Sequence, residues 1–336
     1  MIFRRKIKFH VAQLGDLDRP VVQNALGLAG LVQDAFEFEL LPDRINIPGR
    51  RYQLQNGTFD LDAAVSKLSA IAKLPRPLIL FTSKPYGDLA TQHEADYAYF
   101  SDLAFSKGVG IVSTYLWDPT RNAGGLQPYV FMQLAHAILS YVGGLKPHPE
   151  NRHCLFDYCE ETENVYRIAE GPGLCEPCSR LLMKQINSGS ITTFQVASVT
   201  RLFDRAKGTR RCFYVTPLAP SFRNVHVAVG RAVTDAGWHI SRGDQITQPR
   251  RITDAVIQAL LASELVVVDA TGSNANVFYE LGFAHAAGND VVMLCQKSRT
   301  LLPFDVNHER TIFYRPTVAG LRTLEAELRQ MVALAE

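Results

Sequence analysis

The 336-residue chain is too long for a single small core and is expected to form two domains. Its composition is that of an ordinary globular protein, with 47% hydrophobic residues, and its formal net charge of +2 gives no overall electrostatic reason to expect nucleic acid or an anionic membrane as a partner. The N-terminus lacks an apolar run long enough for a signal peptide, and no segment approaches the roughly 20 apolar residues of a membrane span, so we expect a cytoplasmic location.

The first half of the sequence predicts a mixed α/β domain. Apolar segments typical of strands occur at 6–14, 36–40, 76–82 and 109–116. Segments with helical periodicity occur at 19–35 and 127–144. We assign this domain to residues 1–183, up to the end of a cysteine cluster. Residues 184–210 predict a linker with room for one connecting helix.

The second half predicts a regular alternation of apolar strands and amphipathic helices. Strands are expected at 212–216, 238–240, 264–270, 290–295 and 311–314. Helices are expected at 224–237, 251–263, 276–288 and 319–336. Such alternation is typical of a parallel sheet that is covered by helices on both faces. We therefore predict a doubly wound α/β domain of the flavodoxin or Rossmann kind over residues 211–336.

Four of the six cysteines lie close together in the sequence. Cys154, Cys159, Cys175 and Cys178 follow the pattern C-x4-C-x15-C-x2-C, whereas the other two cysteines stand alone in predicted strands. Two close pairs, one of them C-x2-C, are typical of a zinc site, and four thiolates close a tetrahedral shell with no open position. The sequence therefore predicts a structural Zn²⁺ on these four cysteines, with unpaired core cysteines as the alternative. The adjacent His153 could replace one thiolate.

The segment HCLFDYCEE…LCEPCSRLL resembles the C-terminal part of archaemetzincin-type zincins. That family has a catalytic H-E-x-x-H-x-x-G-x-x-H helix, then a Cys directly after the last His, and a four-cysteine zinc site. Here the catalytic part departs from the family, because Ala137 follows His136 where the Glu belongs and Ser140 replaces the second His. The resemblance implies a zincin-like domain without the parts for zinc-activated hydrolysis, acting as a scaffold or sensor. A metal on His136, His148 or His153 stays open, with simple core packing as the alternative.

Ligands of open parallel sheets bind in the crevice outside the carboxyl ends of the strands. Residues that follow three predicted strands are therefore candidates for substrate binding. They are Pro217 and Ser221 after the first strand, Asp244 after the second, and Asp269, Thr271, Gly272 and Asn274 after the third. Asn274 is a candidate cap of the next helix, and Asn276 within that helix is a further candidate for sugar or phosphate oxygens. No G-x-G-x-x-G segment follows the first strand, so a dinucleotide clamp of the dehydrogenase kind is not expected.

The stretch DATGSNANVFYELGFAHAAGNDVVMLCQ resembles the core motif of nucleoside 2-deoxyribosyltransferase-like proteins, written D-x-T-G-x-N-x-N-V-F-Y-E-L-G-x-A-H-A. The resemblance runs from about residue 213 to residue 296, and related folds include the TIR-type NAD hydrolases. It implies that Glu280 is the nucleophile at the anomeric carbon, that Asp269 orients the sugar hydroxyls and that Tyr214 positions the nucleophile. Transferases of this fold complete each site with a residue of a neighbouring subunit, which implies a homo-oligomer.

The residues around Glu280 agree with a chemical role for its carboxylate. On an exposed helix a Glu usually finds Lys or Arg three or four positions away. Those positions hold Asn276, Val277, Phe283 and Ala284. A carboxylate without a cationic partner is free to attack an anomeric carbon or to stabilise an oxocarbenium-like transition state. The alternative is that Glu280 is merely exposed and that the motif serves packing.

Two functions of different classes follow from these patterns. The first is cleavage, by hydrolysis or transfer, of the N-glycosidic bond in a nucleoside, a nucleotide or NAD. In this version the protein is a signalling or defence effector, and its zinc-bearing half regulates or senses. The second is a nucleotide-binding sensor without turnover. Residual metalloprotease activity is not expected, because the H-E-x-x-H pair is missing.

Overall fold

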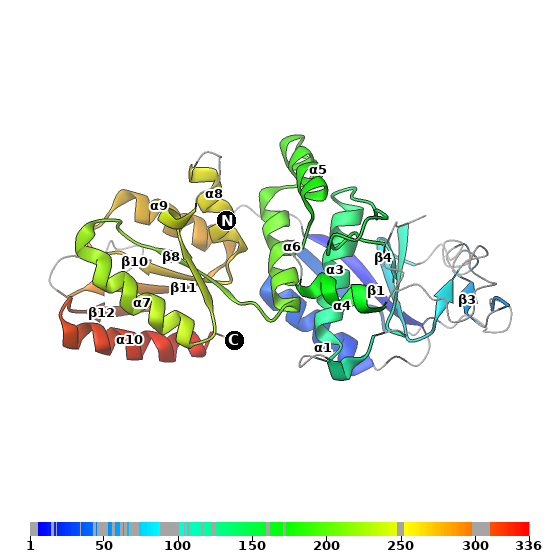
Figure 1. Cartoon of the computed structure of the whole chain (residues 1–336), viewed down its shortest axis with the longest axis horizontal. Coiled ribbons are helices and arrows are strands. Elements are labelled where there is room, and N and C mark those ends of the chain that lie inside the picture. The colour runs from blue at the N-terminus through cyan, green and yellow to red at the C-terminus, as the bar shows by residue number, and fades with distance from the viewer. Residues whose placement is uncertain are drawn as a thin grey trace. The chain divides into compact units, whose positions relative to one another are not determined.

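The chain forms two compact units, of which the first ends at Gly208 and the second begins at Thr209 (Figure 1). No helix within the described ranges is long and apolar enough to cross a membrane. The computed structural model describes residues 6–14, 17, 19–33, 35–42, 45, 53–55, 58–60, 63, 66, 74–87, 101–103, 105, 108–115, 117–121, 125–158, 162–170, 173–246, 252–297 and 310–335.

The first unit is built on a five-stranded mixed sheet with the strand order β2-β1-β4-β7-β6. Four of its strands are parallel and confirm the predicted ones, and the fifth, β6, pairs antiparallel with β7. Their bounds are β1 (Ile7–Leu14), β2 (Phe36–Leu40), β4 (Leu78–Thr82), β6 (Ser101–Asp102) and β7 (Val109–Ser113). A separate short pair joins β3 (Phe59–Asp60) to β5 (Tyr86–Gly87).

Helices α1 (Arg19–Val32) and α6 (Thr193–Ala206) of the first unit pack on α3 (Gln127–Tyr141), in which every residue from Tyr129 to Leu139 is buried. A helix that is apolar on all sides is suited to the centre of a domain. The remaining helices are the short 3-10 turn η3 (Pro119–Arg121), α4 (Thr162–Glu170) and α5 (Glu176–Asn187).

The residues predicted as a linker, 184–210, differ from that expectation. They contain the end of α5 and all of α6, whose Val199, Leu202 and Phe203 belong to the core of the first unit. A capping box starts α6, because Thr192 accepts a hydrogen bond from the Gln195 amide and the Gln195 side chain accepts one from Thr192. The boundary between the two units therefore lies at residues 208–209 rather than across this whole segment.

The second unit is a five-stranded, fully parallel sheet, as predicted, with the order β12-β11-β10-β8-β9. Its strands are β8 (Arg211–Val215), β9 (His239–Arg242), β10 (Leu265–Asp269), β11 (Asp290–Gln296) and β12 (Thr311–Tyr314). Its helical segments are η4 (Pro220–Phe222), α7 (Arg223–Asp235), η5 (Gly243–Gln245), α8 (Ile252–Ala262), α9 (Ala275–Ala287) and α10 (Val318–Ala333).

Both faces of this sheet are covered, which explains why its strands are apolar along their whole length (Figure 1). Helices α7 and α10 pack on one face, over the side chains of Cys212, Tyr214 and Val267. Helices α8 and α9 pack on the other, over Phe213 and Val266. The strand order reverses between β8 and β10, and the crevice at such a switch point is where ligands of doubly wound sheets bind.

Candidate functional site

The turn from β10 into α9 is built by the sequence GSN. Gly272 and Ser273 both adopt positive φ angles, of 78° and 50°, which is common for Gly and rare for Ser. Asn274 then caps α9, as expected, because its side-chain oxygen accepts a hydrogen bond of 2.9 Å from the backbone N–H of Asn276. At its other end α9 stops at Gly288, whose φ of 71° is left-handed. The turn thus places the start of α9 at the carboxyl end of β10.

Glu280 lies on α9, five residues after the helix begins and about 8 Å along its axis. Its side chain is partly buried, and this burial raises the pKa of its carboxyl group above the usual 4.5. Within the described part of the chain, Glu280 makes no hydrogen bond and no ion pair. Glu280 is therefore a half-buried acid without a cationic partner among the described residues.

Asp269 is held inside the sheet rather than presented to solvent. Its side chain is fully buried, and one carboxylate oxygen accepts a hydrogen bond from the Thr271 amide at 3.0 Å. The other oxygen accepts a hydrogen bond of 2.6 Å from the hydroxyl of Tyr314, to which Gln296 donates at 3.2 Å. Burial raises the pKa of Asp269, against the opposing effect of these hydrogen bonds. With both oxygens engaged, Asp269 holds the turn before α9 in this structure.

Tyr214 belongs to the same buried group as Asp269. Its ring packs edge-to-face on His226 at 5.8 Å, on the side of the sheet that α7 covers. Burial, followed by the nearby charge of Asp269, raises the pKa of the Tyr214 phenol well above 10. Glu280 extends from α9, which covers the opposite face. The structure thus brings Tyr214, Asp269 and Tyr314 together, whereas none of the described interactions joins Glu280 to them.

A pocket of about 440 Å³ lies beside this group, at the carboxyl ends of β8 and β9. Its lining includes the predicted Asp244 and three basic side chains, from Arg223, His226 and Arg242. Arg242 pairs with Asp244 through two hydrogen bonds of 2.9 Å, whereas Arg223 makes no ion pair with any described residue. Burial, followed by the charge of Arg242, lowers the pKa of His226. The pocket carries a net positive charge, and it opens at the start of α7, whose dipole favours anions.

The other predicted binding residues surround these groups. Pro217 and Thr271 are buried, while the Ser221, Gly272, Asn274 and Asn276 residues are exposed. Sequence reasoning missed Tyr314, Arg223 and His226. Tyr314 ends β12 and could have been found by the same strand-end argument that selected Asp269. Arg223 and His226 lie on the first turn of α7. A basic residue there is unfavourable for the helix dipole, so its presence points to a role in binding rather than in helix stability.

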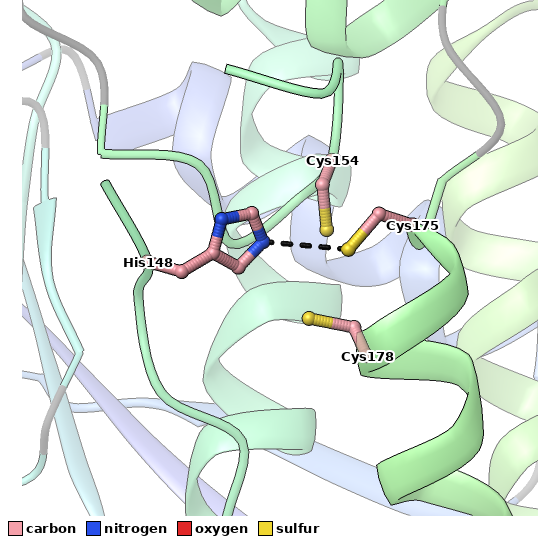
Figure 2. Close-up of side chains that lie close together, drawn as sticks. All are labelled: His148, Cys154, Cys175 and Cys178. Atoms are coloured by element: carbon pink, nitrogen blue, oxygen red, sulfur yellow. Dashed lines mark hydrogen bonds between the residues drawn. The ribbon is translucent and has the colours of Figure 1, made fainter. Parts of the chain in front are cut away.

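A second candidate site lies in the first unit, where Cys154, Cys175 and Cys178 meet His148 (Figure 2). The four ligand atoms lie within 4.8 Å of one another. Cys175 directly precedes α5 and Cys178 lies in its first turn, while His148 and Cys154 come from the segment between α3 and α4. His148 Nε2 is 3.5 Å from Cys175 Sγ, close to the roughly 3.6 Å expected when both atoms bind one tetrahedral zinc.

The partners of His148 favour metal binding through Nε2. Its other ring nitrogen, Nδ1, lies 3.1 Å from the carbonyl oxygen of Glu150 and 3.6 Å from an oxygen of Asp157. Metal-binding histidines usually donate their second N–H to such a carbonyl or carboxylate, which fixes the ring. Asp157 itself accepts hydrogen bonds from the backbone N–H groups of Arg152 and Cys154, at 2.8 and 3.0 Å. The surroundings of the four ligand atoms thus fit a bound cation.

The thiols have strongly perturbed acidities. Burial raises the pKa of Cys178, and the neighbouring cysteine charges add to this effect. At Cys175 burial acts in the same direction, but hydrogen bonds from Cys178 and Cys154 outweigh it and lower the pKa to about 7. When thiols lie this close together, the negative charge of one thiolate makes ionisation of the next less favourable. A divalent cation bound by the thiolates compensates this repulsion. The group could therefore hold a zinc ion as a structural cofactor.

Three of the four predicted zinc ligands are present in this group. The fourth, Cys159, lies outside the described residues, and His148 is the fourth group that the structure brings to the site. His153 is exposed and adopts a left-handed φ of 55°, and it does not belong to the group. His136 is buried in α3, as the packing alternative predicted.

No protein-family model matches the chain, and no curated protein matches it. Among solved structures, an archaemetzincin from Methanopyrus kandleri is 16% identical, with a TM-score of 0.40 over 54% of this chain and 96% of its own. A zinc-dependent peptidase from Methanocorpusculum labreanum is 15% identical, with a TM-score of 0.39 over 52% and 99%. A CMP N-glycosidase from Clostridium botulinum is 16% identical, with a TM-score of 0.28 over 35% and 99%. At this similarity the matches say nothing about what this chain binds or cleaves, and the suggested relation to TIR-type NAD hydrolases stays a prediction.

Proposed function

We propose that the second unit cleaves the N-glycosidic bond of a nucleotide, with Glu280 as the group that acts at the anomeric carbon. The observation that carries this proposal is the half-buried Glu280 carboxylate, which has no cationic or hydrogen-bonding partner among the described residues. Such an anion stabilises the positive charge that develops on the sugar, or forms a covalent glycosyl intermediate that water or a second base resolves.

In this proposal Asp269 and Tyr314 are positioning residues. The buried Asp269 carboxylate fixes the Thr271 amide and the Tyr314 hydroxyl, and it thereby holds the turn from which α9 starts. The resemblance assigns Asp269 a direct contact with sugar hydroxyls, but a fully buried side chain with both oxygens hydrogen-bonded is poorly placed for it. Asn274 and Asn276 are exposed at the start of α9 and are better placed to meet the sugar.

The pocket beside β8 and β9 favours a phosphorylated substrate. Arg223 carries an uncompensated positive charge at the start of α7, and Arg242 and His226 face the same space. Guanidinium groups bind phosphate oxygens through charge-assisted hydrogen bonds, and the helix N-terminus adds to the attraction. We therefore favour a nucleoside phosphate over a free nucleoside, and NAD stays a substrate to be tested.

The second candidate function is a nucleotide-binding module without turnover. The observation that favours it is that no described hydrogen bond or ion pair joins Glu280 to the buried group of Tyr214 and Asp269. Chromatography of reaction mixtures separates the two functions. Purified protein is incubated with nucleosides, deoxynucleosides, their monophosphates and NAD, and release of free base or nicotinamide supports the glycosidase. Nucleotide binding without any release supports the sensor.

Activity should depend on pH through Glu280. Because burial raises the pKa of this carboxyl group above 4.5, the reactive carboxylate is lost at a higher pH than for an exposed Glu. We expect kcat/KM to fall as the pH drops through that raised pKa. A profile measured with the preferred nucleotide tests this expectation, with circular dichroism at each pH to show that the fold persists. Full activity down to pH 4.5 would contradict the role of Glu280.

Replacing Arg223 should change the substrate preference. The Arg223→Ala variant is expected to lose about 10- to 150-fold in kcat/KM for a nucleoside monophosphate, since a hydrogen bond to a charged group contributes about 1.5–3 kcal/mol. Its activity on the unphosphorylated nucleoside should stay unchanged. Arg231→Ala is the matched control, because Arg231 is an exposed residue two turns further along α7. Equal losses for both substrates would mean that the pocket does not bind the phosphate.

A further inference from the structure

A small pocket in the first unit lies between α3 and the segment that carries the zinc ligands. Its volume is about 70 Å³, several times the roughly 10–15 Å³ that a single buried water needs. Helix α3 contributes Gln133 and His136 to its lining, and Asp157 contributes from the other side. Apolar side chains, among them Leu155, Val165 and Ile168, form much of the remaining described lining, and Ser101 and Tyr158 also line the pocket. The pocket is separate from the zinc-binding group but shares the Asp157 environment with it.

Two buried polar groups of this lining lack hydrogen-bond partners among the described residues. His136 is 8% exposed and Gln133 is 5% exposed, and neither His136 Nε2 nor Gln133 Oε1 has a partner. The two residues are three positions apart on α3, so their side chains lie on one face of the helix. Buried polar atoms without partners are rare in folded proteins, because each one loses its hydrogen bonds to water without replacement. Such a pair at a pocket indicates a ligand that supplies the missing partners.

The chemistry of the lining defines the ligand. Burial lowers the pKa of His136 to about 4, so the imidazole is neutral at physiological pH, and in the tautomer with its proton on Nδ1 it accepts a hydrogen bond at Nε2. Gln133 Oε1 is an acceptor as well, and the Asp157 carboxylate repels anions. The two acceptor atoms favour a ligand with N–H donors, and the apolar side chains favour a short hydrocarbon group.

We propose that this pocket binds a small aliphatic molecule that ends in a neutral N–H donor group such as a primary carboxamide. The amide N–H groups donate to Gln133 Oε1 and His136 Nε2, and the hydrocarbon part packs on Leu155, Val165 and Ile168. A carboxylate of the same shape is excluded, because it offers no N–H and meets the charge of Asp157. The site is independent of the proposed glycosidase and gives the first unit a ligand of its own.

Saturation-transfer NMR on the full, zinc-loaded chain tests the proposal with isobutyramide and isobutyrate as matched probes. We expect transfer to isobutyramide only, with at least about tenfold weaker binding in Gln133→Met and His136→Leu. Ser140→Ala is the control, because Ser140 lies one turn beyond His136 on α3 and is not among the lining residues. This variant should bind isobutyramide as the wild type does.

Thermal unfolding separates a ligand site from a structural role. If the two polar groups exist for a ligand, then Gln133→Met and His136→Leu keep or raise the melting temperature of the unliganded protein, since each removes an unsatisfied buried atom. A structural histidine would instead lose stability on replacement. The proposal is overturned if isobutyramide shows no transfer, if it binds all variants equally, if isobutyrate binds as well, or if both replacements lower the melting temperature and leave binding intact.

Discussion

The Glu280→Gln variant should lose base release by roughly 10³-fold or more, which is the scale on which a positioned acid or nucleophile contributes. Glutamine keeps the size of the side chain and removes its charge, so it can neither attack the anomeric carbon nor stabilise a cation beneath it. The measurement is single-turnover release of base from the preferred nucleotide, with titration of nucleotide affinity on the same samples. Affinity should change only modestly, because the phosphate contacts are untouched.

A control substitution at a second acid separates loss of the reacting group from a general effect of removing a negative charge. Asp290 is exposed at the start of β11, at the opposite end of the sheet from the crevice, and Asp290→Asn removes one negative charge there. This control should keep full activity. If Glu280→Gln retains turnover, or if both variants lose it equally, Glu280 is not the reacting group. Binding without turnover in the wild type would favour the sensor.

We also expect Glu280→Gln to change the stability of the folded protein. A carboxyl group whose pKa is raised by burial stabilises the folded state most below its unfolded-state pKa, and this contribution is lost as the pH rises through the folded-state pKa. At neutral pH the ionised Glu280 therefore opposes folding. Glu280→Gln should keep or raise the melting temperature while it abolishes activity. Residues retained for function at a cost in stability behave in this way.

The second unit could be predicted closely from the sequence because its local signals agree with its fold. Strands such as 264–270 are apolar throughout, as expected for a sheet covered on both faces, and capping residues such as Asn274 mark the helix ends. The position of Glu280 relative to Tyr214 could not be predicted. Tyr214 packs on the face of the sheet that α7 covers, whereas Glu280 belongs to α9, which covers the other face, and a strand-end argument does not distinguish the faces.

The first unit was harder to predict because its decisive contacts are tertiary. The sequence predicts a linker over residues 184–210, yet α6 within this segment packs apolar side chains against α3. The capping box of Thr192 and Gln195 was the available signal for this helix. His148 lies six positions before Cys154, outside the usual short spacings of zinc ligands, and only the folded loop brings it to the cysteines.

Loss of zinc should destabilise the first unit strongly and leave the second unit unchanged. Structural zinc contributes about 10–16 kcal/mol of apparent binding energy in zinc-finger peptides. The free energy of unfolding of a whole domain is of similar size, about 5–15 kcal/mol. The ligands join α5 to the loop that carries His148 and Cys154, so removal of the ion frees both. Calorimetry before and after chelation should show one transition shifting to lower temperature and one staying in place.

Substitution of single ligands then decides which residues bind the ion. Cys154→Ser and His148→Ala should each weaken zinc binding by more than the 10–100-fold that loss of an outer-shell partner costs. His153→Ala and Cys212→Ala are the matched controls, an exposed histidine beside Cys154 and a buried cysteine of the second unit, and both should retain one zinc per chain. Competition with a chromogenic chelator measures the affinities. If His148→Ala binds zinc as the wild type does and Cys159→Ser does not, the shell consists of the four cysteines, and His148 is an outer partner that orients one of them.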